Sequence, residues 1–83
     1  MDESVKMLVD AAAADLESEL FVRSFDIDDA CRIVADFMFR RYGVSNYACG
    51  AEVKQAIAAC FDAHPGLQRV ATDGDLLAWK PLA

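Results

Sequence analysis

The apolar residues of this chain change their spacing along the sequence, and that change limits the fold more than any other feature. In three stretches, 3–22, 27–42 and 50–63, apolar residues recur every three or four positions, as they do on one face of an α-helix. Pro65 and Gly66 follow the third stretch directly and end helical structure there. The chain is therefore predicted to begin with three amphipathic helices.

The segment after Gly66 predicts a β-hairpin. Residues 67–71 and 76–80 flank the pair Asp73-Gly74, and Asp-Gly suits a two-residue type I′ turn between antiparallel strands. Closure by this turn predicts that the cross-strand neighbours are Val70 with Leu77 and Gln68 with Trp79. We expect the face of the hairpin that carries Trp79 to pack on the helices.

Helix-end signals and length complete the expected fold. Asp26 is a suitable N-cap for the second helix, and Gly43 suits its C-terminal end. A chain of 83 residues supports one hydrophobic core. The predicted fold class is mainly α with a small β-hairpin, as one domain over residues 1–83 with the hairpin at 67–82.

The helical spacing also predicts which side chains are buried. The expected inward positions are Val5, Leu8, Val9, Ala12, Leu16 and Leu20 in the first helix, Ile27, Ala30, Cys31, Val34, Phe37, Met38 and Tyr42 in the second, and Val53, Ala56, Ile57, Cys60 and Phe61 in the third. Phe39 projects away from the apolar stripe of the second helix, which makes it a candidate contact residue. The pairs Asp28 with Arg32 and Asp36 with Arg40 are spaced for ion pairs on the same helix.

The charge balance favours some partners over others. Fourteen acidic residues against eight Lys and Arg give a net charge of -6, which repels phosphate backbones and attracts basic protein surfaces. No apolar run reaches the length of a membrane span, and the N-terminus lacks the basic region followed by an apolar region that is typical of a signal peptide. Three cysteines without a CxxC pair are typical of reduced thiols. We expect an intracellular, cytoplasmic protein that does not bind membranes.

Three acids of the first helix form a candidate partner-binding surface. Glu3, Asp10 and Glu17 follow one another at seven-residue steps, so they share one face opposite the apolar stripe at intervals of about 10 Å. Such a face is either simply solvated or a site for a basic partner, with Phe39 as the apolar anchor if both helices flank one groove.

The residues that could carry metal or catalytic chemistry are few. Cys31, Cys49, Cys60 and His64 could in principle hold zinc, and Cys60 with His64 has one-turn spacing. Both of these lie on the apolar stripe of the third helix, where such residues commonly fill the core. A histidine one turn from a cysteine also lacks an orienting third group. We therefore expect no metal, no cofactor and no enzymatic activity.

The order helix, helix, helix, β-hairpin resembles the winged-helix superfamily, and the resemblance covers residues 27–82. That resemblance implies that the third helix and the hairpin contact DNA, for which Lys54, Gln55, Arg69 and Lys80 are the candidate residues. The sequence departs from a DNA-binding pattern at Glu52 and Asp62 on the third helix and at Asp73 and Asp75 in the turn. These acids weaken the expectation of DNA binding.

In size, acidity and lack of catalytic groups the chain is also similar to bacteriophage-encoded inhibitors such as anti-CRISPR proteins. This similarity implies a viral protein that mimics DNA and inhibits or regulates a nucleic-acid-handling complex through its acidic surface. Two alternatives stay open: a winged-helix DNA-binding transcriptional regulator, and a subunit-interaction module. The alanines at 11–14 and at 51, 58 and 59 allow close approach of another helix, so a homodimer is compatible with the sequence.

Overall fold

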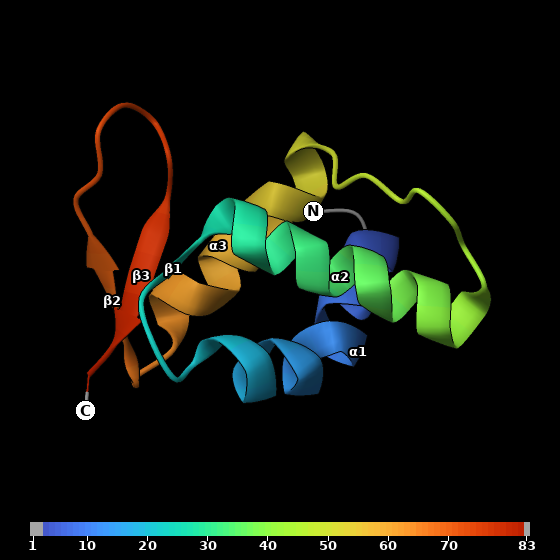
Figure 1. Ribbon diagram of the computed structural model, residues 1–83, viewed down its shortest axis with the longest axis horizontal. Coiled ribbons are helices and arrows are strands. Elements are labelled where there is room, and N and C mark those ends of the chain that lie inside the picture. The colour runs from blue at the N-terminus through green and yellow to red at the C-terminus, as the bar shows by residue number, and fades with distance from the viewer. Residues whose placement is uncertain (1–2, 83) are drawn as a thin grey trace.

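The computed structural model describes residues 3–82 and has three helices and a small antiparallel sheet (Figure 1). The elements in chain order are α1 (Glu3–Leu20), β1 (Phe25–Asp26), α2 (Ile27–Tyr42), α3 (Ala51–Ala63), β2 (Leu67–Val70) and β3 (Ala78–Pro81). The mainly α fold class with a small C-terminal sheet is confirmed. Among the described residues, no helix has the length and apolar character needed to cross a bilayer.

The ends of α2 follow the sequence signals. The Asp26 carboxylate accepts a hydrogen bond from the backbone N–H of Asp29, and the Asp29 carboxylate accepts one from the N–H of Asp26, which completes a capping box. At the other end Gly43 has a φ of 69°, in the left-handed region, and its N–H bonds the carbonyl oxygen of Phe39. Both predicted caps are confirmed.

The sheet has one strand more than the predicted hairpin. Its order is β1-β3-β2, so β3 lies in the centre and pairs with both neighbours in antiparallel fashion. In β1, Phe25 lies opposite Trp79 and Asp26 lies opposite Ala78. The sequence did not predict β1, because two residues next to a helix cap carry no alternating pattern.

The register of the hairpin differs by one residue from the predicted one. Arg69 lies opposite Trp79 and Val70 lies opposite Ala78, and the connection 71–77 is a seven-residue loop in place of a two-residue turn. The reason is burial: Leu67 and Trp79 are both buried, and side chains alternate between the faces of a strand. The predicted pairing would have put Leu67 and Trp79 on opposite faces.

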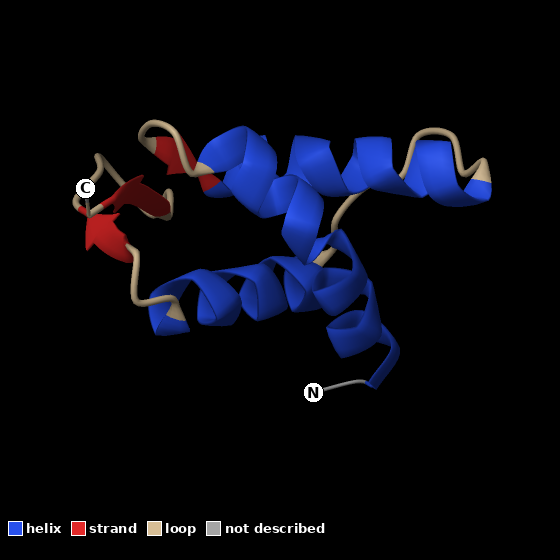
Figure 2. Cartoon of the chain, turned by 90° about the horizontal axis from the view of Figure 1, so that it is seen from below, coloured by secondary structure: helices blue, strands red, loops and turns tan. Residues whose placement is uncertain are grey.

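The helices and the sheet enclose one core. Figure 2 shows the helices packed together with the strands gathered at one end, and in Figure 1 the connector 43–50 returns from the far end of α2 to α3. The buried residues include most of the predicted set: Val9, Ala12, Leu16, Leu20, Ile27, Ala30, Val34, Phe37, Val53, Ala56, Ile57 and Phe61. Val5, Leu8, Cys31 and Met38 are partly buried against this core.

Two predicted core positions are wrong, and one outward position is wrong. Tyr42 is 60% exposed because it lies in the last turn of α2. Cys60 is exposed, whereas Ala58, one of the alanines expected to be open to the approach of another helix, is buried. The inward face of α3 is therefore rotated toward Ala58 relative to the predicted face, and α1, α2 and β2 all pack against this helix.

Candidate functional site

Asp62 of α3 joins that helix to the sheet. Its carboxylate accepts a hydrogen bond of 2.9 Å from the indole Nε1 of Trp79. The same carboxylate accepts two bonds from the Arg69 guanidinium, one of 3.1 Å from Nε and one from Nη2. The guanidinium also lies 5.3 Å from the centroid of the Trp79 ring, within range of a cation–π contact. Arg69 is thus held on both sides by residues of this chain.

The Arg69 contact lowers the pKa of Asp62. The hydrogen bond from Arg69 is the largest cause, and the bond from Trp79 acts in the same direction against the effect of burial. Asp62 is therefore a carboxylate at neutral pH, and its negative charge neutralises Arg69. Arg69, a candidate residue for nucleic-acid contact, is thus paired with an acid of this chain, although both side chains are 44% exposed.

The other residues of that assignment are available on the surface. Lys54, Gln55 and Lys80 are exposed, the first two on α3 and the third on β3. Exposed acids accompany them: Glu52 on α3 and Asp73 and Asp75 in the hairpin loop. The face formed by α3 and the hairpin therefore has no net positive charge.

The three acids of the candidate partner-binding surface are exposed on α1. Glu3, Asp10 and Glu17 all point away from the core. Asp10 borders a hollow between α1 and α3 that is lined by Lys6, Val9, Ala56, Ala59 and Cys60. We use the term acidic stripe for Glu3, Asp10 and Glu17 together; its last two members lie on the α3 side of α1.

Glu17 forms a polar contact that connects α1 to the end of α3. Its Oε1 lies 3.3 Å from Nε2 of His64, and Nδ1 of the same ring accepts a hydrogen bond of 2.9 Å from the N–H of Gly66. The accepting Nδ1 implies that Nε2 carries the proton and donates to Glu17. Both ring nitrogens therefore have a polar partner within the chain.

The cysteines lie in two places. Cys49 interacts with Cys31 across the contact between the connector and α2, and burial raises the pKa of the Cys49 thiol to about 12. Cys60 lies on α3 beside the acidic stripe; burial, followed by the charges of Asp10 and Glu17, raises the pKa of this thiol. Within residues 3–82 no cluster of three or more His, Cys, Asp or Glu residues is placed to hold a metal ion.

Phe39 is exposed, as its position on the helical wheel predicted, with 58% of its surface accessible. It lies on α2, whereas the hollows that Asp10 and Glu17 border are formed by residues of α1, α3 and the turns that follow these two helices. The structure therefore does not bring Phe39 into the hollows beside these two acids.

The bases of α2 are largely neutralised within the protein. Arg40 bonds Asp36 at 2.7 Å, as predicted, and also bonds Asp15 of α1 at 2.7 Å. Arg32 pairs with Asp29, three residues before it, and the predicted pair with Asp28 is wrong. The capping box explains this choice, because it already orients the Asp29 carboxylate.

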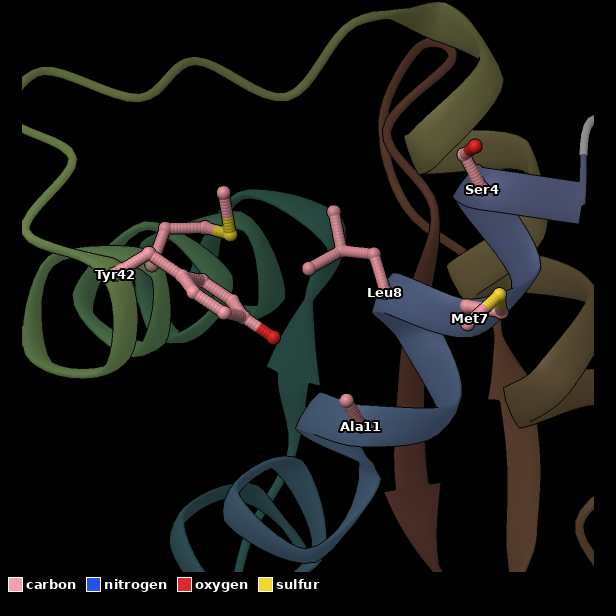
Figure 3. A pocket seen from close by; sticks show the side chains of 6 residues that line it. Ser4, Met7, Leu8, Ala11 and Tyr42 are labelled. Atoms are coloured by element: carbon pink, nitrogen blue, oxygen red, sulfur yellow. The ribbon is translucent and has the colours of Figure 1, made fainter.

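A groove between α1 and α2 was not identified from the sequence. It is about 420 Å³ in volume and is lined by Ser4, Met7, Leu8, Ala11, Met38 and Tyr42. Figure 3 shows Leu8 of α1 and Tyr42 of α2 reaching toward each other across it. Met7 is 64% exposed, so apolar surface lies open to solvent here. The adjacent apolar residues Met7 and Leu8 of the first helix could have indicated this groove. Because Leu8 and Tyr42 were expected in the core, the sequence did not predict that they line a groove.

Comparison with protein-family models, with curated proteins and with solved structures finds no match to this chain. The arrangement itself has a winged-helix-like order, with three helices and a small antiparallel sheet whose last two strands form a hairpin. The function is therefore inferred from the surfaces of this chain alone.

Proposed function

We propose that this chain is a non-enzymatic binding protein of winged-helix type that regulates or inhibits a nucleic-acid-handling protein by occupying its basic surface. The observation that carries the proposal is the engagement of Arg69 by Asp62 and Trp79. This engagement neutralises a base on the hairpin, where a DNA-reading winged helix needs free positive charge. The acids of the acidic stripe meanwhile stay exposed.

The distribution of charge supports a basic partner. The helix α1 carries five acids and one base, and the whole chain has a net charge of -6. Carboxylates at regular helical steps present a row of negative charge, which raises the rate of encounter with a positive channel. A partner that normally binds phosphates offers such a channel, so the acidic stripe would compete with its nucleic acid.

A DNA-binding transcriptional regulator is the second candidate, and the observation that favours it is the order of the elements. In a winged-helix protein the third helix and the hairpin are the parts that meet DNA. Here the exposed Lys54, Gln55 and Lys80 lie on those parts. These groups give a weak phosphate interaction, because only the two lysines contribute a salt-sensitive charge term and the net charge of the chain repels phosphates.

Titration with a random-sequence DNA duplex separates the two candidates. We expect no binding at about 150 mM salt, and weak binding at most when the salt is lowered to about 50 mM. Tight binding whose affinity falls steeply with salt, and which is lost in Lys54→Ala and Lys80→Ala, would replace the proposed function by the DNA-binding one.

Affinity capture from a nuclease-treated lysate of the source organism tests the acidic stripe. A variant with Glu3→Lys, Asp10→Lys and Glu17→Lys should lose the captured partner, because the charges that attract it are reversed. The matched control reverses Asp28, Asp73 and Asp75, which are exposed acids outside α1 with the same total change of charge. Partner capture that survives the first variant and is lost in the control would contradict the assignment to α1.

Phe39 lies outside the hollows beside Asp10 and Glu17, but its exposed ring on α2 is proposed as a separate apolar contact of the same partner. Phe39→Ala should speed dissociation with little effect on association, because a buried aromatic anchor typically contributes about 2 kcal/mol or more. Val22→Ala is the control, since Val22 is an exposed apolar residue outside α2. Equal dissociation rates for both variants would exclude Phe39 from the interface.

A further inference from the structure

The residues that line the groove between α1 and α2 are arranged so that one more helix could pack against them. Its lining residues on α1, at positions 4, 7, 8 and 11, share one helical face, and those on α2, at positions 38 and 42, are one turn apart. Ser4 and Ala11 are small and let a further helix approach closely. Met7 and Met38 have flexible side chains that adapt to the side chains they meet.

The groove and the acidic stripe are contiguous. Met7 lines the groove, and it follows Glu3 by four residues and precedes Asp10 by three, so the two carboxylates are its neighbours on the surface of α1. Both carboxylates are exposed. An occupant of the groove therefore has its apolar face against Leu8 and Tyr42 and one edge beside Glu3 and Asp10.

From this contiguity we infer that the groove between α1 and α2 binds an amphipathic helix of the partner protein that carries lysine or arginine along one edge. The inference deepens the proposed function and rests on it, because it assigns the recognition element of the basic partner. The lining on α1 from Ser4 to Ala11 spans about 10 Å, so the occupant needs about two turns with apolar residues at the first, fourth or fifth, and eighth positions.

Electrostatic repulsion disfavours a second copy of this chain as the occupant of the groove. Pairing two copies through this groove brings Glu3 and Asp10 of both copies to the edges of the same interface, and like charges held together there oppose association. Arg40, which lies where α1 meets α2, does little to offset this repulsion, because it is already bonded to Asp15 and Asp36. Arg41 is the remaining base there, lining the adjacent hollow with Asp15 and Phe37.

Calorimetric titration with a synthetic peptide tests the inference. The probe is an amidated and acetylated helical peptide of about 15 residues, with leucines on one face, lysines along one edge of that face and alanines elsewhere. A second peptide has glutamate in place of every lysine. We expect the lysine peptide to bind the full chain at least about tenfold more tightly than the glutamate peptide. Equal affinity for the two peptides, or no binding of the lysine peptide, would overturn the inference.

Variants of the protein locate the binding. Met7→Gln and Tyr42→Ser should each weaken the lysine peptide about tenfold or more, and Glu3→Gln with Asp10→Asn should weaken it and reduce its salt dependence. Val22→Gln and Asp28→Asn are the matched controls for exposed apolar and acidic residues outside the groove. Each variant is first checked by thermal melting, and Met7→Gln is decisive if Tyr42→Ser unfolds. Binding that is unchanged in Met7→Gln would overturn the inference.

Failure of the inference and failure of the proposed function have different signatures. If reversal of the acidic stripe abolishes partner capture while Met7→Gln leaves the peptide titration unchanged, the function stands and the groove is excluded. Dimerisation of the free protein that is abolished by Met7→Gln would assign the groove to a second copy and would likewise overturn the inference. Tight, salt-dependent DNA binding through Lys54 and Lys80 would instead remove the proposed function.

Discussion

The indole Nε1 of Trp79 donates a hydrogen bond of 2.9 Å to Asp62, and the same carboxylate holds the guanidinium of Arg69. Trp79 is fully buried and lies 5.0 Å from Phe61 and 5.9 Å from Phe25, measured between ring centroids. The one polar atom of the buried indole is therefore satisfied. This contact links the central strand of the sheet to α3 and neutralises a hairpin base in the process.

Trp79→Ala should lower the free energy of unfolding by about 3 to 5 kcal/mol, because it leaves a cavity among Phe25, Phe61 and the sheet. Chemical denaturation of both proteins measures the difference. Leu76→Ala, in the exposed hairpin loop, is the control and should change stability by about 0.5 kcal/mol or less. A native tryptophan emission spectrum like that of the unfolded chain would contradict the burial.

The lowered pKa of Asp62 predicts a loss of stability in acid. The folded-state pKa lies below the unfolded value, so the ionised carboxylate stabilises the fold above the unfolded pKa, and this contribution is lost as the pH falls through the folded one. The side chain is 44% exposed, so the effect is at most about 1 kcal/mol. Denaturation as a function of pH should show a weaker acid dependence in Asp62→Asn; an identical dependence would show that Arg69 does not perturb this carboxyl.

The thiol of Cys49 should resist alkylation in the folded protein. Burial raises its pKa to about 12, so the reactive thiolate is scarce at neutral pH and remains so up to mildly alkaline pH. Iodoacetamide labelling followed by peptide mass spectrometry should modify the exposed Cys60 before Cys49. Denaturant should remove the difference. Faster labelling of Cys49 than of Cys60 in the native protein would contradict the packing of the connector against α2.

Asp26→Ala should destabilise the protein by about 1 kcal/mol, because the N-terminal N–H groups of α2 lose their capping carboxylate. Thermal denaturation followed by circular dichroism measures the change. Asp28→Ala, two residues later and without a capping role, should cost only a few tenths of a kcal/mol. Equal losses for the two variants would assign the effect to general helix-end charge and not to the capping box.

The sequence by itself determined the local structure of this protein. The helical spacing predicted three helices, and Asp26 and Gly43 marked the ends of α2 correctly, because caps and periodicity depend on neighbouring residues only. The exposure of the acidic stripe and of Phe39 followed from the same spacing.

Only the tertiary structure decided the sheet and the surfaces next to it. The strand β1 forms because β3 offers its free edge to Phe25 and Asp26, and the hairpin register follows from burying Leu67 together with Trp79. The groove lined by Met7 and Tyr42 arises where α1 and α2 meet, so no single stretch of sequence displays it. Arg69 looked like a free base for the same reason, since its partners Asp62 and Trp79 reach it only through the packing of the sheet on α3.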